Sequence, residues 1–450
     1  MNPFAASQRA RDDDPSGPSD DSSQAVWSIV FWAAAWFFFI LLSYSIIRPV
    51  RETMGAIGGT RQLQGLMLVT FAVMVLVVPI YATLVNRLPR RWLVRVVFHF
   101  FCVSLLAFSL ALDSGNESVQ VWAARTFFVW VNVFGLFSTS VFWSVLADLF
   151  SSEQGKRLFG RIAAGGTVGA ISGSLLTSQI AIKVSTSTLL LIPIATLQLG
   201  LWCAWRLEKR VAKQATESTS DATVESGEEA LPTGGLWEGI THVLSSPYLA
   251  LICMFLFFGQ AAGTQLYFQQ AEIVAQSVVD DQAKTQVFAY IDFATQILTL
   301  TAQLLLSGFI LRRLGVSIAL LLLPLVYLVS FVALSFHSSL AVVAAAMVAA
   351  RATGYGITVP AREVLFTVVS REAKYKSKSF IDTVVLRGGD AISGQVFGFL
   401  RSTVGLAFTT LNLWTLPIIA LWGFLAIRLG RQQCRLADSI ADDFDRDAGN

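Results

Sequence analysis

The sequence predicts an all-α polytopic membrane protein with twelve transmembrane helices in two homologous six-helix halves. The chain is 54% hydrophobic and only 14% charged, with a mean hydropathy of +0.61, whereas soluble domains contain about 25% charged residues. A charged turn after an apolar run also occurs twice. It reads Ala82-x-x-x-Asn86-Arg87-x-Pro89-Arg90-Arg91 in the first half and Gly308-x-x-x-Arg312-Arg313-x-Gly315 in the second. Repetition at half the chain length is typical of secondary transporters.

A second pair of motifs repeats in the same way. Glu153 to Arg157 precedes Ala170-Ile-Ser-Gly173, and Glu372 to Lys378 precedes Ala391-Ile-Ser-Gly394.

Because a helix needs about 20 apolar residues to cross a bilayer, we take each long apolar run as a span. The twelve predicted spans are residues 27–47, 65–85, 93–112, 121–147, 160–181, 187–205, 247–270, 285–310, 314–335, 338–359, 379–400 and 406–427.

The distribution of cations predicts the orientation of the chain. Arg and Lys gather in alternate loops, and the loops between these are poor in cations. Since cationic loops stay in the cytoplasm, both termini are expected there. We divide the chain into a disordered acidic tail (1–26), an N-terminal six-helix half (27–205), a cytoplasmic linker rich in Ser, Thr and Glu (206–246), a C-terminal half (247–428) and a cytoplasmic C-terminal tail (429–450).

Several classes of function are disfavoured by composition. The net charge of +3 gives no sign of a nucleic-acid partner. Four cysteines and three histidines are scattered without metal-ligand spacing, so we predict no metal site. No nucleophile–base pair is recognisable, and we expect neither an enzyme nor a cofactor. The glycines at 165, 166 and 169 lack the lysine of a phosphate-binding loop, and close contact between helices explains them better.

Charged residues within or beside the spans are the candidates for function, because each costs a few kcal/mol to insert. Cations lining a central cavity predict an anionic substrate, whereas snorkelling or mutual pairing of the charges is the alternative. The predicted substrate-binding residues are Arg48, Arg51, Arg125, Arg351, Arg362 and Arg387. The predicted coupling or counter-ion residues are Glu52, Asp292, Glu363, Asp382 and Asp390.

Two six-span halves joined by a long cytoplasmic loop resemble the major facilitator plan. The first charged turn resembles that superfamily's loop signature, G-x-x-x-D-R-x-G-R-R, with Asn86 in place of the acid and Pro89 in place of the glycine. The resemblance implies alternating access by rocking of the halves, and that a carrier of this plan can act as a monomer. It also implies a cytoplasmic gate, for which we predict Asn86, Arg87, Arg312, Arg313, Asp148, Lys156 and Arg157.

Three stretches resemble the non-mitochondrial ATP/ADP translocases of plastids and intracellular bacteria. They are Ile47-Arg-Pro-Val-Arg-Glu-Thr53, the run from Phe142-Trp143 through Asp148 to Arg157, and the run from Arg362-Glu363 through Asp382 to Arg387. The resemblance implies a divergent member in the bacterial inner membrane that exchanges ATP for ADP or takes up nucleotides, with the lipid bilayer as its other partner. Arg51 matches a basic residue that contributes to transport in that family.

The chain also departs from that family's pattern. Residues 121–147 contain no acid, and the seventh span has Gln260, Gln265, Gln269 and Gln270 where the family uses an acid and a lysine. A carrier for another organic anion or a proton-coupled solute therefore stays open as the alternative. A membrane scaffold without transport activity is a further alternative function.

Overall fold

The computed structural model describes residues 20–150, 152–218, 246–370, 377 and 381–448, and these ranges contain helices and turns but no strand. The N-terminal half comprises α2 (Asp20–Ile57), α3 (Gly59–Arg87), α4 (Arg90–Leu112), α5 (Glu117–Leu149), α6 (Ser152–Ile180), α7 (Thr186–Leu189) and α8 (Leu191–Ser218). The C-terminal half comprises α10 (Pro247–Ser277), α11 (Asp281–Thr301), η1 (Ala302–Ser307), α12 (Gly308–Arg313), α13 (Gly315–Phe336), α14 (Leu340–Thr353), η2 (Gly354–Thr358), α15 (Val359–Leu365), η3 (Phe366–Val368), η4 (Ile381–Val385), α17 (Leu386–Ser402) and α18 (Phe408–Ala448).

Ten helices of the described residues are long and apolar enough to cross a membrane, and they coincide with ten of the predicted spans. The other two predicted spans, 160–181 and 379–400, correspond to α6 and to η4 with α17. These two are less apolar because α6 is rich in Gly, Ser and Thr, and α17 contains charged residues. The prediction of an all-α polytopic membrane protein is confirmed.

The helices extend beyond the predicted spans. α2 begins within the segment predicted as a disordered tail, α8 continues into the predicted linker, and α18 continues through most of the predicted C-terminal tail. A helix satisfies its own backbone hydrogen bonds and does not need to end where the hydrocarbon ends. An apolar run therefore locates the membrane-buried part of each helix and underestimates its length.

Each half is built around its own apolar core. Large aromatic side chains such as Trp36 and Phe142 are buried in the N-terminal half, and Phe331 and Trp422 are buried in the C-terminal half. A third, smaller cluster joins residues of both halves, including Phe128 on α5. It is completed by Ala56, Leu63 and Leu66 on one side and by Phe268, Ala271, Val274, Phe288, Phe397 and Leu411 on the other.

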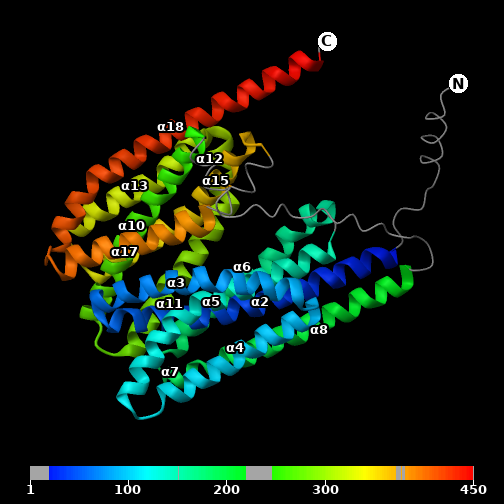
Figure 1. Cartoon of the computed structure of the whole chain (residues 1–450), viewed down its shortest axis with the longest axis horizontal. Helices are drawn as coiled ribbons and strands as arrows, with labels where there is room; N and C mark the ends of the chain where they lie inside the picture. Colours follow the sequence, from blue (N-terminus) through cyan, green and yellow to red (C-terminus); the bar gives the residue numbers. More distant parts are fainter. Residues whose placement is uncertain (1–19, 151, 219–245, 371–376, 378–380, 449–450) are drawn as a thin grey trace.

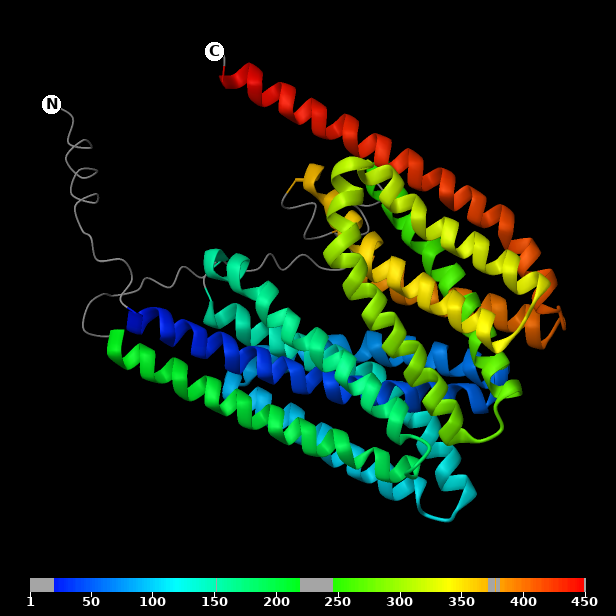
Figure 2. The same ribbon diagram turned by 180° about the vertical axis from the view of Figure 1, so that it is seen from behind.

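This third cluster marks the end of the molecule where the two halves meet, which we name the contact end. Figures 1 and 2 show the halves diverging from there toward the opposite end, where α2 begins and α18 ends. Polar contacts between the halves also lie at the contact end. They include Thr53–Thr285 (2.8 Å between hydroxyls), Gln286 Nε2 to the Ser178 carbonyl (2.8 Å) and Gln64 Nε2 to Gln395 Oε1 (3.0 Å).

Helices α2 and α6 approach each other through glycines at four-residue spacing. A Cβ atom on Gly165 would lie 2.7 Å from the Ala34 carbonyl oxygen, and one on Gly169 would lie 2.2 Å from that of Phe38. The same holds at Gly173, where the distance to the Leu42 carbonyl oxygen would be 2.4 Å. Only hydrogen fits at this contact, as expected for close helix contacts in membranes. The prediction that these glycines serve helix contact rather than phosphate binding agrees with this geometry.

Substitution of Gly169 by valine is expected to destabilise the N-terminal half by about 3 kcal/mol or more, because the added methyl groups must displace the α2 backbone. The matched control is Gly160→Val, since a Cβ atom there meets no atom within 4 Å. We expect the yield of monodisperse detergent-solubilised protein to collapse for Gly169→Val and to stay near wild type for the control. Equal yields would contradict the close contact.

Candidate functional site

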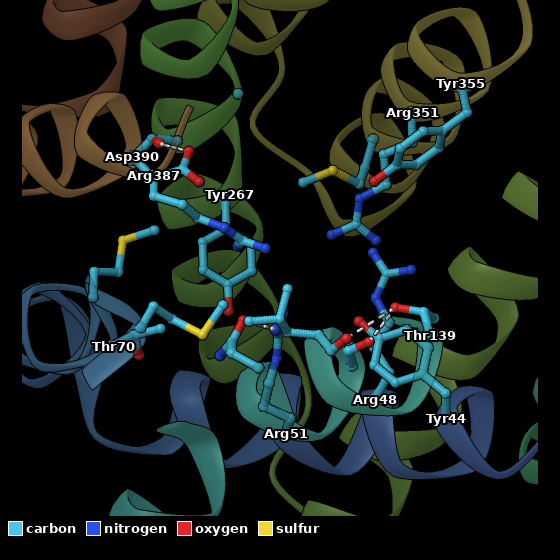
Figure 3. A pocket seen from close by; sticks show the side chains of 18 of the residues that line it. Tyr44, Arg48, Arg51, Thr70, Thr139, Tyr267, Arg351, Tyr355, Arg387 and Asp390 are labelled. Atoms are coloured by element: carbon cyan, nitrogen blue, oxygen red, sulfur yellow. Dashed lines mark hydrogen bonds between the residues drawn. The ribbon is translucent and has the colours of Figure 1, made fainter. Parts of the chain in front are cut away.

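A cavity of about 780 Å³ lies between the two halves and is lined by residues of both (Figure 3). Four of its lining residues are arginines, two from α2 and one each from α14 and α17. They are Arg48, Arg51, Arg351 and Arg387, and Asp390 is the one acid among the described lining residues. Much of the remaining wall is aromatic or polar, and this part includes Tyr44, Phe71, Phe128, Asn132, Tyr267, Gln296, Tyr327 and Tyr355. Leucine, methionine and glycine residues complete the wall.

Five of the charged groups form a continuous chain from one half to the other. Arg51 Nη2 lies 2.5 Å from Glu52 Oε1, and Arg48 Nε lies 3.8 Å from the same oxygen. Arg48 Nε is also 3.6 Å from Asp292 Oδ2, while Arg351 Nη1 is 3.0 Å from Asp292 Oδ1. Both carboxylates are almost fully buried, with side-chain exposures of 2% and 4%. Each lies between two arginines, and this pairing offsets part of the cost of burying its charge.

The local sequence of α2 explains one side of this chain. Arg48 and Glu52 are four residues apart and lie on the same helix face, and Arg51 is one turn from Arg48. The Arg51 guanidinium donates from Nη1 to Asn132 Oδ1 at 3.1 Å and lies 5.3 Å from the centre of the Phe128 ring. Asn132 and Phe128 are themselves one turn apart on α5, so a single face of α5 positions Arg51.

The other side of the chain comes from α11 and α14. Asp292 is the acid of α11 that faces α2, and it forms an ionic bridge between the halves because it lies beside Arg48 of one half and Arg351 of the other. Arg351 is flanked by buried Ala350 and Ala352 and is followed by the wide helical turns of η2. Small neighbours of this kind leave room for a guanidinium to reach across a helix interface.

Arg387 and Asp390 stand apart from this chain. Asp390 Oδ1 accepts hydrogen bonds from Gln260 Nε2 (3.0 Å) and Thr264 Oγ1 (3.2 Å), both on α10. Arg387 extends from α17 into the cavity, one helical turn from Asp390 (Figure 3). The structure shows no hydrogen bond or ion pair within 4.0 Å between its guanidinium and another described residue. Arg387 is therefore the arginine of the cavity most available to an anion.

Three of the other predicted substrate-binding and counter-ion residues, Arg125, Arg362 and Glu363, are not among the residues that line the cavity. Arg125 donates to Gln62 Oε1 at 3.2 and 3.3 Å and lies 5.2 Å from the Trp122 ring. Arg362 and Glu363, neighbours on α15, are 3.5 Å apart. The side chain of Asp382 lies outside the described part of the chain.

The predicted gate residues are only partly described. The side chains of Asn86, Lys156 and Arg157 lie outside the described residues. Asp148 pairs with Arg90 within the N-terminal half. Arg87 ends α3, and Arg312 and Arg313 end α12, where Arg312 Nε donates to the Gly308 carbonyl at 3.0 Å.

An ion pair at the contact end was not predicted from the sequence. Glu272 on α10 lies 2.5 Å from Arg401 Nη2 on α17 and accepts a hydrogen bond from Thr60 Oγ1 of the other half at 2.8 Å. Arg401 is also 4.4 Å from the centre of the Phe408 ring. The sequence feature that could have indicated this ion pair is Arg401, a cation at the contact end of α17, where cations are otherwise few. Together with Gln64 and Gln395, this group closes the contact end.

Replacement of Glu272 by glutamine is expected to favour opening of the contact end, because Arg401 loses its ion pair and Thr60 loses a charged acceptor. We expect maleimide labelling of a cysteine placed at Leu63, which is 1% exposed, to become several-fold faster in a background lacking the native cysteines. Asp280→Asn, which only caps α11, is the control. Unchanged labelling would show that Glu272 does not hold the halves together.

Comparison with known proteins places this geometry in a family. Residues 27–381 match the family model of the Major Facilitator Superfamily, and no curated protein matches the chain by sequence. The fold is similar to a bacterial homologue of the iron transporter ferroportin in the inward-facing state (TM-score 0.63, 11% identity, covering 90% of this chain and 98% of that one). It is also similar to a D-xylose–proton symporter (0.61, 11%, 91% and 97%) and to the nucleoside transporter NupG (0.54, 15%, 90% and 98%).

These structural neighbours, at 15% identity or below, establish the fold and leave the substrate open. The family match covers well over half of the chain and agrees with the arrangement of the two halves around a central cavity. The protein is therefore a multi-pass membrane transporter that belongs to the Major Facilitator Superfamily.

Proposed function

We propose that the protein moves a small organic anion across the membrane by alternating access, with nucleotides as the first substrates to test. The observation that carries this proposal is the set of four arginines on one central cavity, of which Arg387 has no ion pair with a described residue. Guanidinium groups bind carboxylate and phosphate through paired, charge-assisted hydrogen bonds. Placing four of them in a membrane interior is costly, and an anionic substrate gives a reason for that cost.

The neutral part of the cavity suits a nucleotide. Four tyrosines line it, at positions 44, 267, 327 and 355, and their rings offer flat apolar surfaces next to polar hydroxyls. The volume of about 780 Å³ is within the usual range for a small-molecule site. Exchange of ATP for ADP is the activity implied by the resemblance of Ile47–Thr53 and of the two longer stretches to the ATP/ADP translocases.

The contacts between the halves support one direction of access. Apolar and polar contacts join the halves at the contact end, and the halves diverge toward the end where α2 begins and α18 ends. With both termini in the cytoplasm, as the loop cations predict, this conformation faces inward. Rocking of the halves would then separate the contact end and admit substrate from outside.

The experiment is a binding screen followed by transport. Purified protein in detergent is heated with a panel of nucleotides and other organic anions, since binding to the folded state raises its apparent stability. Anions that stabilise the protein are then tested for exchange in proteoliposomes. A selective shift with nucleotides that disappears in Arg387→Ala supports the proposal. Nucleotide transport without dependence on Arg387 would contradict the proposed site.

A proton-coupled solute is the second candidate, and Asp390 favours it. This acid lines the cavity, and its carboxylate accepts hydrogen bonds from the neutral side chains of Gln260 and Thr264. A carboxylate without a cation in direct contact is a reasonable proton site in a transporter. Uptake driven by an imposed pH gradient, and lost in Asp390→Asn, would favour this candidate over exchange.

A further inference from the structure

The charges around the cavity do not cancel. Within the described part of the chain, the cavity and the residues directly behind its wall contain four guanidinium groups and three carboxylates, which leaves one positive charge. The groups are Arg48, Arg51, Arg351 and Arg387, with Glu52, Asp292 and Asp390. A substrate with four negative charges would therefore leave about three of them uncompensated in a site of low dielectric.

Five of these seven charges are fixed by one another. Glu52 and Asp292 each lie between two arginines, so removing either carboxylate takes an ion pair from two arginines and leaves one of them without a charged partner in the chain. Arg387 and Asp390 are the two that remain. They are three residues apart on α17, and each points at the cavity without an ion pair within 4.0 Å to a described residue. The charge that the cavity presents to a ligand can be changed at these two positions without breaking the chain.

We infer that the cavity selects its substrate by net charge, that it prefers organic anions with one or two negative charges, and that Asp390 is the residue that lowers the accepted charge by one unit. The inference rests on the proposed function, because it assumes that the cavity binds an organic anion. Its physical basis is that an unpaired charge in a buried site is penalised far more than in water. A ligand of matching charge avoids that penalty, and a more highly charged relative does not.

Asp390 and Arg387 are expected to shift the preferred ligand charge in opposite directions. Removing the carboxylate of Asp390 raises the charge of the cavity by one, so the preferred ligand becomes one unit more negative. Removing the guanidinium of Arg387 lowers it by one, so the preferred ligand becomes one unit less negative. A residue with a merely structural role would weaken all ligands together and would leave their order unchanged.

The test uses ligands that share one base and differ in charge. Adenosine, cyclic AMP, AMP, ADP and ATP carry about zero, one, two, three and four negative charges at neutral pH. Their dissociation constants are measured on the full-length protein without divalent cations, which would otherwise neutralise the phosphates. We expect the tightest binding at cyclic AMP or AMP, with ATP weaker by about tenfold or more. Asp390→Asn is expected to move the optimum one step toward ATP, and Arg387→Gln one step toward adenosine.

The control is Thr264→Val, which removes a hydrogen bond to Asp390 without changing charge and should leave the optimum in place. Affinity that rises steadily from AMP to ATP in the wild type would overturn the charge inference while supporting a nucleotide carrier. If no nucleotide binds, the nucleotide proposal fails, and butyrate, succinate and tricarballylate provide the same comparison with carboxylates. An optimum that does not shift in either variant would overturn the role of Asp390.

Discussion

Replacing Arg51 or Arg387 by alanine is expected to reduce transport at least about 30-fold, with no loss of membrane insertion. Both guanidinium groups line the cavity, and loss of one partner of a desolvated ionic contact costs roughly 2–5 kcal/mol of binding. Arg387 has no ion pair with a described residue. Its removal therefore takes no ion-pair partner away from a described carboxylate. The measurement is uptake of labelled substrate into proteoliposomes, normalised to the amount of inserted protein.

The control for this pair is Arg125→Ala. Arg125 is also an intramembrane arginine, but it contacts Gln62 and Trp122 rather than the cavity, so we expect uptake within about twofold of the wild type. Wild-type uptake in both Arg51→Ala and Arg387→Ala would show that the cavity is not the anion site. Equal losses in all three variants would point to a general effect on folding.

Replacing Asp292 by alanine is expected to destabilise the protein by about 3–5 kcal/mol. Asp292 is buried and lies beside both Arg48 and Arg351. Its removal leaves Arg351 without an ion pair to a described residue and leaves Arg48 with Glu52 alone, and it also removes the ionic contact that Asp292 makes between the halves. The measurement is the midpoint of thermal unfolding in detergent.

A second substitution separates this explanation from simple loss of volume. Adding Arg351→Gln to Asp292→Ala removes the cation that loses its ion pair in the single variant, so we expect the double variant to be more stable than Asp292→Ala alone. Asp390→Asn should cost much less, since its oxygen is held by the neutral groups of Gln260 and Thr264. If the double variant is less stable than either single variant, the buried pair does not account for the effect.

Much of the fold follows from the sequence because a membrane imposes few choices. Apolar runs of about 20 residues must become helices, and the positions of all twelve predicted spans correspond to helices. The lengths of the helices could not be predicted from the apolar runs. α18, for example, has 41 residues, because its polar end stays helical although it carries no apolar signal. The glycines of α6 were correctly assigned to helix contact, since no strand precedes them as it would in a phosphate-binding loop.

The sequence predicted most of the charged residues of the candidate site, but it did not predict which of them form ion pairs. Arg48, Arg51, Glu52 and Arg351 stand out as costly charges, whatever they contact. That Asp292 lies between Arg48 and Arg351 depends on the crossing of α2, α11 and α14, which no local pattern encodes. Arg125 gave the same sequence signal as Arg351, although it lies outside the cavity. Neutral partners such as Asn132 and Thr264 gave no signal, because polar residues with neutral side chains are tolerated throughout a membrane bundle.

The chain of alternating charges across the cavity has an electrical consequence. Membrane voltage acts on net charge, at up to about 2.3 kcal/mol per charge for each 100 mV. Counted over the described residues, the empty cavity has one excess positive charge, so its reorientation would respond to the voltage. A cavity filled by a singly charged anion is neutral, and its reorientation would not respond to the voltage. The voltage would then govern the return of the empty carrier rather than the step that carries the cargo.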